Sequence, residues 1–310
     1  MRTSEEFYNF FNTELVPALA PHEEVRKKAL QQIWTWWAMI GGLSLVLLLI
    51  FRNIQVLFFT VVIGWIVQYW STRQFRGDFK ADILTRIVHF ISPGLSYNKD
   101  SGISQKEFEY SRLFLQGIDE YDREDQVQGR IGETRLRFSE VHAKYVTHDS
   151  KGHRTEHTIF RGLFFIADFN KNFPGRTYVL ADTAENLLGG VGTWLQSQDR
   201  SRGELVKLED PDFEKLFAVF SSDQVEARYI LSTSFMARLV DFRKKAGRQI
   251  SLAFLDNRIY VALAYSRDLF EPNVFRTLLD YSAIKSYFDD LTFVLSMVED
   301  LNLNVRIWGK

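Results

Sequence analysis

The chain has 310 residues, of which 46% are hydrophobic and 15% aromatic, enough to bury the core of one or two folded domains. This composition excludes a wholly disordered chain, and a formal net charge of -1 gives no overall support for binding nucleic acid or an acidic substrate. Cysteine is absent, which excludes disulfides, thiolate catalysis and cysteine-based zinc or iron–sulfur sites.

The N-terminal segment carries apolar residues at helical spacing among charged ones. Residues 1–32 are therefore predicted to form one or two amphipathic helices. Because proline removes a backbone donor and clashes with the preceding turn, we expect a break in the helix near Pro21.

Two charge-free runs follow, separated only by Arg52 and Asn53. They span residues 33–51 and 54–70, and each has about the ~17–20 residues that a helix needs to cross a hydrocarbon core. A continuous helix would hold Arg52 in mid-bilayer, at a cost of roughly 2.5–3.5 kcal/mol. Residues 33–70 are therefore predicted to form a two-helix transmembrane hairpin with its tip at Arg52 and Asn53. A re-entrant hairpin that enters from one leaflet is the alternative.

Flanking residues predict the orientation of this hairpin. Basic residues lie at both outer ends, whereas the tip carries only Arg52; they are Arg26, Lys27, Lys28, Arg73, Arg76 and Lys80. By the positive-inside rule, both ends of the hairpin are predicted to be cytoplasmic. Aromatic residues gather where the first run begins and the second ends, as expected for a belt at one membrane interface. This predicted belt comprises Trp34, Trp36, Trp37, Trp65, Tyr69 and Trp70.

Small residues at four-residue spacing occur in both runs, as Ala38 with Gly42 and as Thr60 with Gly64. This spacing could let the two helices approach each other closely. Alternatively, it reflects no more than the general frequency of small residues in membrane helices.

After the second run, apolar residues recur every four positions from Phe75 to Ile91, with basic residues among them. Residues 71–95 are predicted to form a juxtamembrane helix that ends near Pro93. The basic residues favour contact with anionic lipid as the helix leaves the bilayer. A helix that faces a protein core and keeps its charges in water is the alternative.

The rest of the chain, residues 96–310, is predicted to form a cytosolic α+β domain with antiparallel strands. A slip in the alternation of TRLRFSEVHAKYV predicts a bulge near Ser139 and Glu140. The polar run that follows predicts a long loop before the strand TIFRGLFFIADF. The run SLAFLDNRIYVALAY predicts two strands joined by a tight turn at Asp256 and Asn257.

Helix signals lie between and after these strands. The Asp-Pro pair at 210–211 predicts a helix start, the polar residues 232–234 offer N-caps for a second helix, and Gly247 is its expected C-cap. The apolar periodicity of residues 274–301 predicts a long C-terminal helix that packs on the sheet or on a partner.

Four histidines within a short segment suggest a metal site: His142, His148, His153 and His157. Their spacing matches no ligand motif, and no cysteine lies near them, so exposed loop histidines are the favoured interpretation. We therefore expect neither a metal nor a cofactor.

Carboxylates at strand ends raise a second hypothesis. Asp168, Asp182 and Glu185 could form a cation or acid–base site, although acidic residues at strand ends are also ordinary turn chemistry. The glycines in residues 188–192 lack the lysine of a phosphate-binding loop and predict a flexible turn. The sequence has no nucleophile elbow, His-Glu-x-x-His or kinase motif, so no catalytic residue is predicted and an enzyme is the less favoured class.

Several longer phrases are distinctive. They are GRIGETRLRFSEVHA, IFRGLFFIADFNKNFPGRTYVLAD, KLEDPDFEKLFAVFSSDQVEARYILSTSFM and LNLNVRIW. In this order they resemble the blocks of a bacterial family catalogued as domain of unknown function 3137. The resemblance implies a membrane-anchored protein of the bacterial inner, or cytoplasmic, membrane, without assigned catalytic residues. It also suggests an envelope assembly with LemA-type membrane proteins.

These blocks supply a candidate interaction surface, because they combine glycine, aromatic and charged residues suited to a loop that grips a partner. Its residues are Phe160, Gly162, Phe164, Asp168, Phe169, Lys171, Phe173, Glu226 and Arg228. In the alternative interpretation the phenylalanines are core residues, Gly162 serves backbone geometry, and Glu226 and Arg228 form an ion pair that fixes the fold.

The sequence therefore favours a membrane-anchored scaffold that presents its cytosolic domain to a protein partner, as a homo-oligomer or a hetero-complex. The hairpin, the aromatic richness of the domain and the lack of catalytic motifs support this hypothesis. One alternative is a sensor that binds a ligand or lipid near the bilayer. The other is a membrane-tethered hydrolase that uses Asp168, Asp182 or Glu185.

Overall fold

The computed structural model describes residues 2–53, 55–181, 202–301 and 303. The chain divides into two compact units. Unit 1 comprises Met1–Ile91 and Leu269–Thr292, and unit 2 comprises Ser92–Asp268 and Phe293–Lys310.

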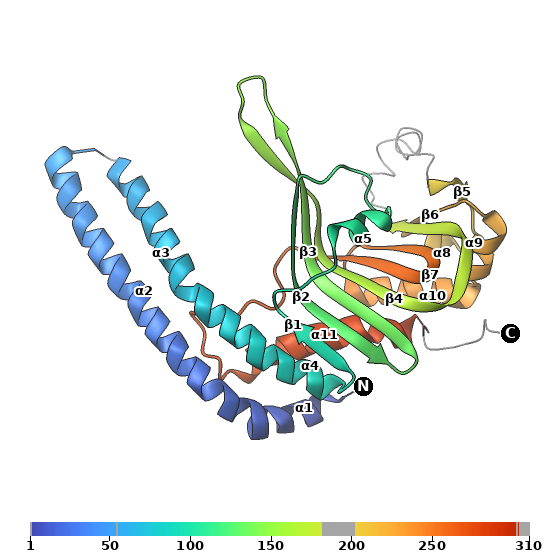
Figure 1. Cartoon of the computed structure of the whole chain (residues 1–310), viewed down its shortest axis with the longest axis horizontal. Helices are drawn as coiled ribbons and strands as arrows, with labels where there is room; N and C mark the ends of the chain where they lie inside the picture. The colour runs from blue at the N-terminus through green and yellow to red at the C-terminus, as the bar shows by residue number, and fades with distance from the viewer. Residues whose placement is uncertain (1, 54, 182–201, 302, 304–310) are drawn as a thin grey trace. The chain divides into compact units, whose positions relative to one another are not determined.

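Unit 1 is helical. Its elements are α1 (Ser4–Phe10), η1 (Phe11–Leu15), α2 (Val16–Phe51), α3 (Gln55–Phe79), η2 (Lys80–Leu84), α4 (Thr85–Ile91) and the first part of α11 (Tyr281–Asp300). The π-helical turns η1 and η2 join α1 to α2 and α3 to α4, so two long helical limbs result. Figure 1 shows α2 and α3 as an antiparallel pair.

The predicted helix break at Pro21 is wrong. The helix α2 continues through Pro21, and the local irregularity lies upstream, in η1. The side chains of Leu19 and Glu23, on either side of the proline, are buried. Their packing offsets the one backbone hydrogen bond that proline removes.

The fold-back at Arg52 and Asn53 is confirmed as a structural feature. Arg52 adopts a left-handed conformation with φ of 47°, and its N–H donates to the carbonyl oxygen of Leu48 at 2.8 Å. The N–H of Gln55, the first residue of α3, donates to the side-chain oxygen of Asn53 at 2.9 Å. The two polar residues therefore end one helix and cap the next.

Stacked aromatic rings join α1 to α4 and to the first part of α11 within unit 1. The Phe7 ring stacks on that of Phe288 at 4.2 Å, and the Phe10 ring stacks on that of Phe90 at the same distance. The apolar residues at four-residue spacing in 71–95 are buried as far as Ile87. Their burial agrees with a helix that faces a protein core, and α4 ends at Ile91, near the predicted end.

Unit 2 is an α+β unit with an antiparallel sheet, as predicted. Its elements are β1 (Leu95–Asn98), α5 (Gln105–Tyr110), β2 (Glu120–Ile131), β3 (Thr134–His148), β4 (Arg154–Ala181), β5 (Glu204–Val206), α8 (Pro211–Glu214), β6 (Phe217–Ser221), α9 (Gln224–Ile230), α10 (Thr233–Ala246) and β7 (Ile250–Ala264). The strand order is β1-β2-β3-β4-β6-β5, and β7 pairs with β4. The long strand β4 is the centre of the sheet, because it pairs with β3, β6 and β7.

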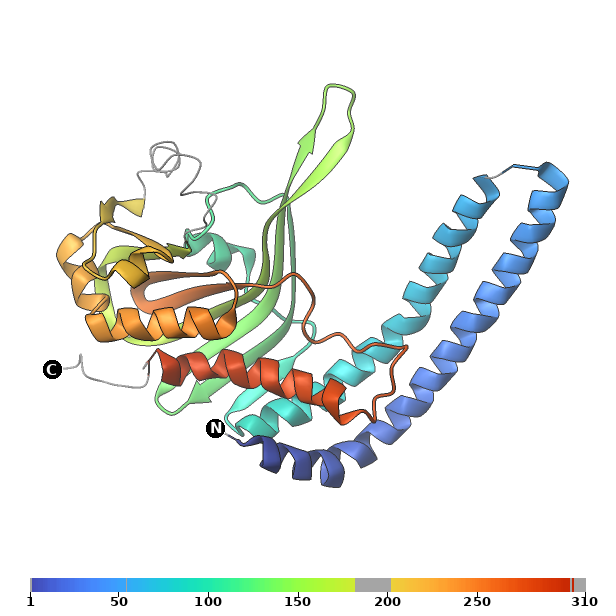
Figure 2. The ribbon, with the colours of Figure 1, turned by 180° about the vertical axis from the view of Figure 1, so that it is seen from behind.

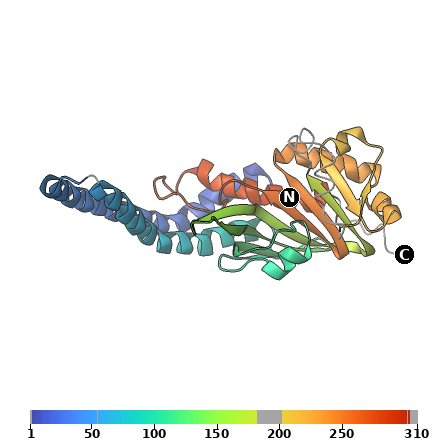
Figure 3. The same ribbon diagram turned by 90° about the horizontal axis from the view of Figure 1, so that it is seen from above.

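Both faces of the sheet are covered. On one face, Phe108 of α5 packs with Phe164 and other buried residues of β4 and β7. On the other face lie α10 and the end of α11, as Figures 2 and 3 show. There Phe235 of α10 contacts the Phe254 ring of β7, at 5.8 Å between ring centroids. Strands with both faces buried explain the long apolar runs of β4 and β7.

The helix ends of unit 2 agree with the sequence signals. Asp210 caps α8, and its carboxylate accepts hydrogen bonds from the N–H groups of Asp212 and Phe213. Ser232 caps α10, and Gly247 ends it with φ of 61°. These predictions succeeded because caps depend on a few neighbouring residues.

Three details of the strands differ from expectation. The bulge lies in β2, between Glu124 and Val127, and Ser139 of β3 faces it. The loop of the β3–β4 hairpin is short, because the strands continue through the polar run until His148 pairs with Arg154. The alternation slips near Ser139 because both faces of β3 are buried there, not because β3 itself bulges.

The last third of the chain differs from the predicted fold in two places. The strand β7 is continuous, and Asp256 forms a left-handed bend with φ of 57° instead of a turn between two strands. Both halves of β7 pair with the same long strand, β4, so the chain bends without reversing. The C-terminal helix α11 begins only at Tyr281, because residues 269–280 form a loop.

Candidate functional site: the apolar helical hairpin

The helices α2 and α3 expose large apolar side chains along much of the hairpin. In α2 these include Met39, Leu43, Leu45, Val46, Leu49, Ile50 and Phe51, and in α3 they include Leu57, Phe58, Phe59, Val61, Ile63 and Ile66. Soluble monomers rarely expose apolar patches of this extent, which mark contact with a protein or a membrane.

One helix in the described part of the chain is long and apolar enough to cross a membrane. It runs from Ser4 to Phe51, and 11% of its most apolar window is buried, unlike the core helix of a soluble protein. For α3, whose charge-free part runs from Gln55 to Thr72, membrane crossing rests on the sequence pattern alone. Crossing by both helices therefore stays a prediction, as does the re-entrant alternative.

The two aromatic clusters of the predicted belt lie at one level of the hairpin. Trp37, in the first cluster, contacts Gly64, which directly precedes the second: a Cβ at position 64 would lie 2.6 Å from the indole ring. Trp34, Trp36, Trp65, Tyr69 and Trp70 are exposed. An antiparallel hairpin thus places both clusters where one interface could hold them.

Of the two predicted pairs of small residues, only the pair in α3 lies at the contact between the helices. Gly64 receives the ring of Trp37, and the hydroxyl groups of Ser44 and Thr60 form a hydrogen bond between the helices. In contrast, a Cβ at Gly42 would meet no atom within 4 Å. The small pair of α3 therefore serves the contact with α2, whereas Gly42 of α2 does not.

A buried ion pair fixes the loop 269–280 to the base of the hairpin. Arg26 donates from Nε and Nη2 to the carboxylate of Glu23 at 2.8 and 2.7 Å, and both side chains are buried. Arg26 Nη1 also donates to the carbonyl oxygen of Val274 at 2.7 Å, and Glu23 accepts from the N–H of Leu278 at 2.9 Å. We call these four residues the base clamp.

A second ion pair attaches the same loop to the other limb. Lys80, which is buried, lies 2.5 Å from the carboxylate of Glu271, and Arg76 lies 3.3 Å from it. Four of the basic residues that predicted the orientation thus have acidic partners within unit 1, because Lys27 also pairs with Glu24 at 2.8 Å. Lys27, Lys28 and Arg73 are exposed.

The phenylalanines of the candidate interaction surface lie mainly in the core. Phe160, Phe164 and Phe173 are buried, and Phe169 is half-buried, with its ring 5.4 Å from that of Phe254. These positions agree with the core interpretation that the sequence left open. Binding of a partner through these residues stays a prediction.

The other residues of this surface in β4 have separate surroundings. Gly162 serves backbone geometry: its φ is 152°, and a Cβ there would lie 2.2 Å from the carbonyl oxygen of Leu263. Asp168 is half-buried at a groove of the sheet. The side chain of Lys171 lies outside the described part of the structure.

Glu226 and Arg228 form separate interactions. Glu226, which is buried, accepts a hydrogen bond from the N–H of Gly175 at 2.9 Å. Arg228 is exposed and donates to the carbonyl oxygen of Gln224 at 2.9 Å. Residues two positions apart point to different sides of a helix, which explains why an ion pair between them does not form.

The four histidines do not gather at one point. His157 stacks on Tyr145 with ring centroids 4.7 Å apart, His153 lies 2.8 Å from the carboxylate of Asp149, and His148 is exposed. His142 lines a polar cavity instead. Burial lowers the pKa of His142, and the nearby charges of Lys144 and Arg161 act in the same direction.

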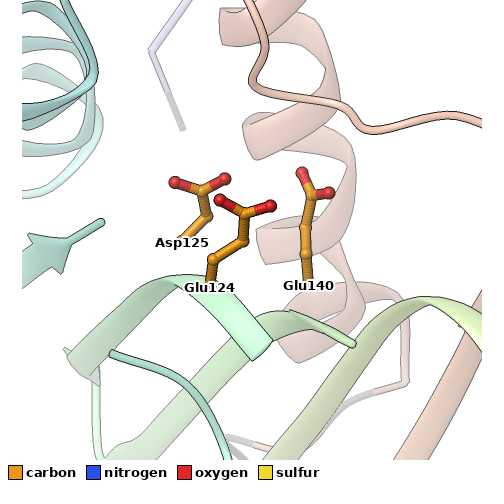
Figure 4. A group of neighbouring side chains, drawn as sticks. All are labelled: Glu124, Asp125 and Glu140. Carbon is orange, nitrogen blue, oxygen red and sulfur yellow. The ribbon is translucent and has the colours of Figure 1, made fainter. Parts of the chain in front are cut away.

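A group of carboxylates that sequence reasoning missed borders the same cavity of about 500 Å³. One side-chain oxygen from each of Glu124, Asp125 and Glu140 lies within 4.8 Å of the other two. Figure 4 shows the three carboxylates beside one another. The bulge in β2 places Asp125 here, with φ of 59° and no exposure. Burial and the neighbouring Asp125 raise the pKa of Tyr97, which donates a hydrogen bond to this carboxylate.

Three oxygens from this group could serve a hard cation such as Ca²⁺ or Mg²⁺. Carboxylates also gather on proteins without binding a metal, so the cluster alone does not define a site. Of the carboxylates that the sequence singled out, Asp168 lies elsewhere. Asp182 and Glu185, like the glycines in 188–192, fall outside the described residues.

Arginines line a second cavity, of about 670 Å³, on one face of the sheet. Its arginines are Arg135, Arg137 and Arg258. Arg137 is paired with Glu107 of α5, and Arg258 faces Asp168 across β4 and β7. We call this cavity the arginine groove.

The fold and the hairpin define an α+β protein with at least one helix able to cross a membrane. Residues 158–303 match the model of a family described as "Protein of unknown function (DUF3137)". The match runs from within β4 to beyond the end of α11 and is to the family that the sequence resembles, which confirms the resemblance. No curated protein matches the chain.

Among solved structures, the chain is similar to the crystal structure of the mycobacterial trehalose monomycolate transport factor A, TtfA. The similarity covers 68% of this chain and 96% of that chain, with 12% sequence identity and a TM-score of 0.34. A similarity this low assigns neither a fold nor a function to the present protein.

Proposed function

We propose that this protein is a membrane-anchored scaffold of the bacterial inner membrane, whose hairpin enters the bilayer and whose unit 2 binds a protein partner in the cytoplasm. The observation that carries the membrane part is the exposure of large apolar side chains on both α2 and α3. In water this surface would drive aggregation, whereas lipid covers it.

The proposed orientation places both ends of the hairpin in the cytoplasm. Exposed Lys27, Lys28 and Arg73 lie just outside the aromatic belt, and Arg52 is the only basic residue at the tip. This asymmetry supports the orientation through the positive-inside rule. Because Arg52 and Asn53 are polar and exposed, the tip fits the opposite, aqueous side of the membrane.

An exposed apolar patch on unit 2 supports the partner-binding part. Val225 and Tyr229 lie four positions apart on α9, so they share one side of the helix, and both are exposed. Leu205 of the edge strand β5 is also exposed and is joined to α9, because Gln224 donates to its carbonyl oxygen at 3.1 Å. Apolar residues at a sheet edge beside a helix provide a surface for protein binding.

The partner-binding proposal is tested by purification from native membranes in mild detergent, followed by mass spectrometry. A stoichiometric partner, a second copy or a LemA-type membrane protein among the candidates, is expected with the parent chain. The double variant Val225→Ser and Tyr229→Ser is expected to lose it, whereas Tyr110→Ser, at an exposed tyrosine of α5, keeps it. A tagged chain is co-expressed with an untagged one, so that a second copy is also detected. Recovery of the tagged chain with neither an untagged copy nor another protein, or equal recovery of partner with both variants, contradicts this proposal.

The arginine groove favours a second candidate function, a sensor of an anionic ligand. Arg135 and Arg258 are exposed within it, and Asp168 is the single acidic residue of its lining. The probe is inorganic pyrophosphate, which is expected to raise the melting temperature of the full chain through mass action. Arg135→Gln is expected to remove this rise, and Arg238→Gln, on the exposed side of α10, to preserve it.

A further inference from the structure

The loop 269–280 is an ordered part of unit 1. Leu269, Phe270, Val274 and Leu278 are buried, and the base clamp bonds the backbone at Val274 and Leu278 to α2. Figures 1 and 2 both show this loop beside α2 and α3. The loop is therefore held at a fixed height on the hairpin.

This loop nevertheless exposes two large apolar side chains. Phe275 is 54% exposed and Leu279 is 43% exposed, although each directly follows a buried residue. Hydrogen bonds fix both positions: the N–H of Phe275 donates to Asn273 Oδ1 at 2.9 Å, and that of Leu279 donates to Thr277 Oγ1 at 3.3 Å. The loop thus holds an apolar surface outward that the fold of unit 1 does not cover.

The loop is attached to α2 and α3 a short distance outside the predicted membrane spans, so its exposed apolar surface lies close to the proposed bilayer. Arg26 lies seven residues before Ile33, and Arg76 lies six residues after Trp70. At a rise of 1.5 Å per residue these separations are roughly 9–11 Å. The polar headgroup layer extends about 5–8 Å beyond the hydrocarbon core on each side. A loop attached at these two points lies directly beneath the headgroups, within reach of an aromatic side chain.

The charges around the loop fit an anionic surface. Arg276 follows Phe275 and is exposed, and Lys28 and Arg73 are exposed on the adjacent limbs. Of the nearby acidic residues, Glu271 is paired with Lys80 and Arg76, Glu23 with Arg26, and Glu24 with Lys27. Asp280 is half-buried and accepts hydrogen bonds from Ser282, and Asp78 is the exposed acidic residue that offsets part of the basic charge. Basic residues beside exposed apolar ones are the combination that binds peripheral segments to anionic lipid.

We infer that the loop 269–280 is a second membrane contact, in which Phe275 and Leu279 enter the headgroup layer and Arg276 binds anionic lipid headgroups. This inference rests on the proposed insertion of the hairpin. It assigns the base clamp a function: the clamp holds the loop against the same bilayer and so fixes the tilt of unit 1 on the membrane.

The absence of cysteine allows a direct test with single-cysteine variants of the full chain. Phe275→Cys, Leu45→Cys and Val225→Cys each carry a fluorescent dye, in vesicles of equal amounts of phosphatidylglycerol and phosphatidylcholine. Nitroxide quenchers are placed either on the lipid headgroup or deep in the acyl chain. Val225 is the matched control, because it is 78% exposed and lies in unit 2.

The dye at position 275 is expected to lose fluorescence mainly to the headgroup quencher, the dye at position 45 to the deep quencher, and the dye at position 225 to neither. If only the dye at 275 escapes quenching, the loop does not touch the membrane and this inference fails, while hairpin insertion stands. If the dye at 45 also escapes, the proposed insertion itself fails. Arg276→Gln tests the charge contribution: quenching at 275 is expected to fall in these vesicles and to be unchanged in pure phosphatidylcholine.

Discussion

Gly64 of α3 lies against the indole ring of Trp37 of α2, so close that a Cβ on the glycine would come within 2.6 Å of the ring. This contact fixes the register of the hairpin, because it places the aromatic clusters of both limbs side by side. A few residues nearer the tip, the hydrogen bond between Ser44 and Thr60 supports the same register. The hairpin is therefore a specific pair of helices and not two independent apolar segments.

Gly64→Leu is expected to separate the two helices at the belt. The added side chain must displace the Trp37 ring, and overpacking of this kind costs about 1–3 kcal/mol. The readout is the yield of a disulfide between Ser44→Cys and Thr60→Cys in the same chain, which falls in this variant. Gly42→Leu is the control, because nothing lies within 4 Å of its Cβ position. Equal yields in both variants would show that Gly64 does not set the register.

Glu23→Gln is expected to destabilise unit 1 strongly. It leaves Arg26 buried without its partner charge, a change that costs about 3–5 kcal/mol when one member of a buried pair is removed. Hydrogen exchange of the loop 269–280 is expected to accelerate as the base clamp opens. The control is Glu24→Gln, at the residue that follows Glu23. It breaks the exposed ion pair with Lys27 and should cost at most about 1 kcal/mol. Similar exchange in the two variants would contradict the role of the clamp.

Local chemistry explains which parts of the fold could be predicted. The turn at Arg52 was predictable because one charge in an apolar run is costly, and the caps of α10 because Ser232 and Gly247 are adjacent to it. The base clamp was not, because Arg26 bonds Val274, 248 positions away in the sequence. From the sequence, Arg26 was only one of several flanking basic residues.

Gly162→Ala is expected to destabilise unit 2. The Cβ would meet the carbonyl oxygen of Leu263 at 2.2 Å, and this atom belongs to the backbone of β7, so it cannot move aside without disturbing the strand pair. The positive φ adds strain, and such positions cost about 1–3 kcal/mol. The free energy of unfolding in urea, measured on the full chain, checks this loss. Gly117→Ala, which meets nothing within 4 Å, should behave as the parent.

The stability of unit 2 is expected to fall as the pH drops below about 6.5, the usual pKa of histidine. Because burial lowers the pKa of His142 in the folded protein, the unfolded chain binds the proton first, and acid favours unfolding. This loss of stability is absent above that pH. It grows as the pH falls, until the pH reaches the pKa of His142 in the folded protein. Melting temperatures between pH 7.5 and 5 should therefore depend less on pH in His142→Gln. His148→Gln, at an exposed histidine of the same strand, should keep the pH dependence of the parent.

The candidate sites were less predictable than the hairpin. The histidines were selected by their closeness in sequence, but His142 and His148 lie in β3, His157 lies in β4, and His153 lies in the loop between these strands. Their surroundings therefore differ. The cluster of carboxylates joins residues from two different strands. Glu124 and Glu140 meet through the register of β2 and β3, and a bulge in β2 adds Asp125. Register and bulges result from pairing across the sheet, which a single sequence does not reveal.

The central claim is that the hairpin crosses the membrane with both ends in the cytoplasm, and labelling of single cysteines in spheroplasts tests it most directly. A membrane-impermeant maleimide added outside should react with Arg52→Cys at the tip. Lys27→Cys at the base and Val225→Cys in unit 2 should react only after the membrane is permeabilised. If Arg52→Cys is also protected until permeabilisation, the tip does not reach the far side and crossing by both helices is contradicted.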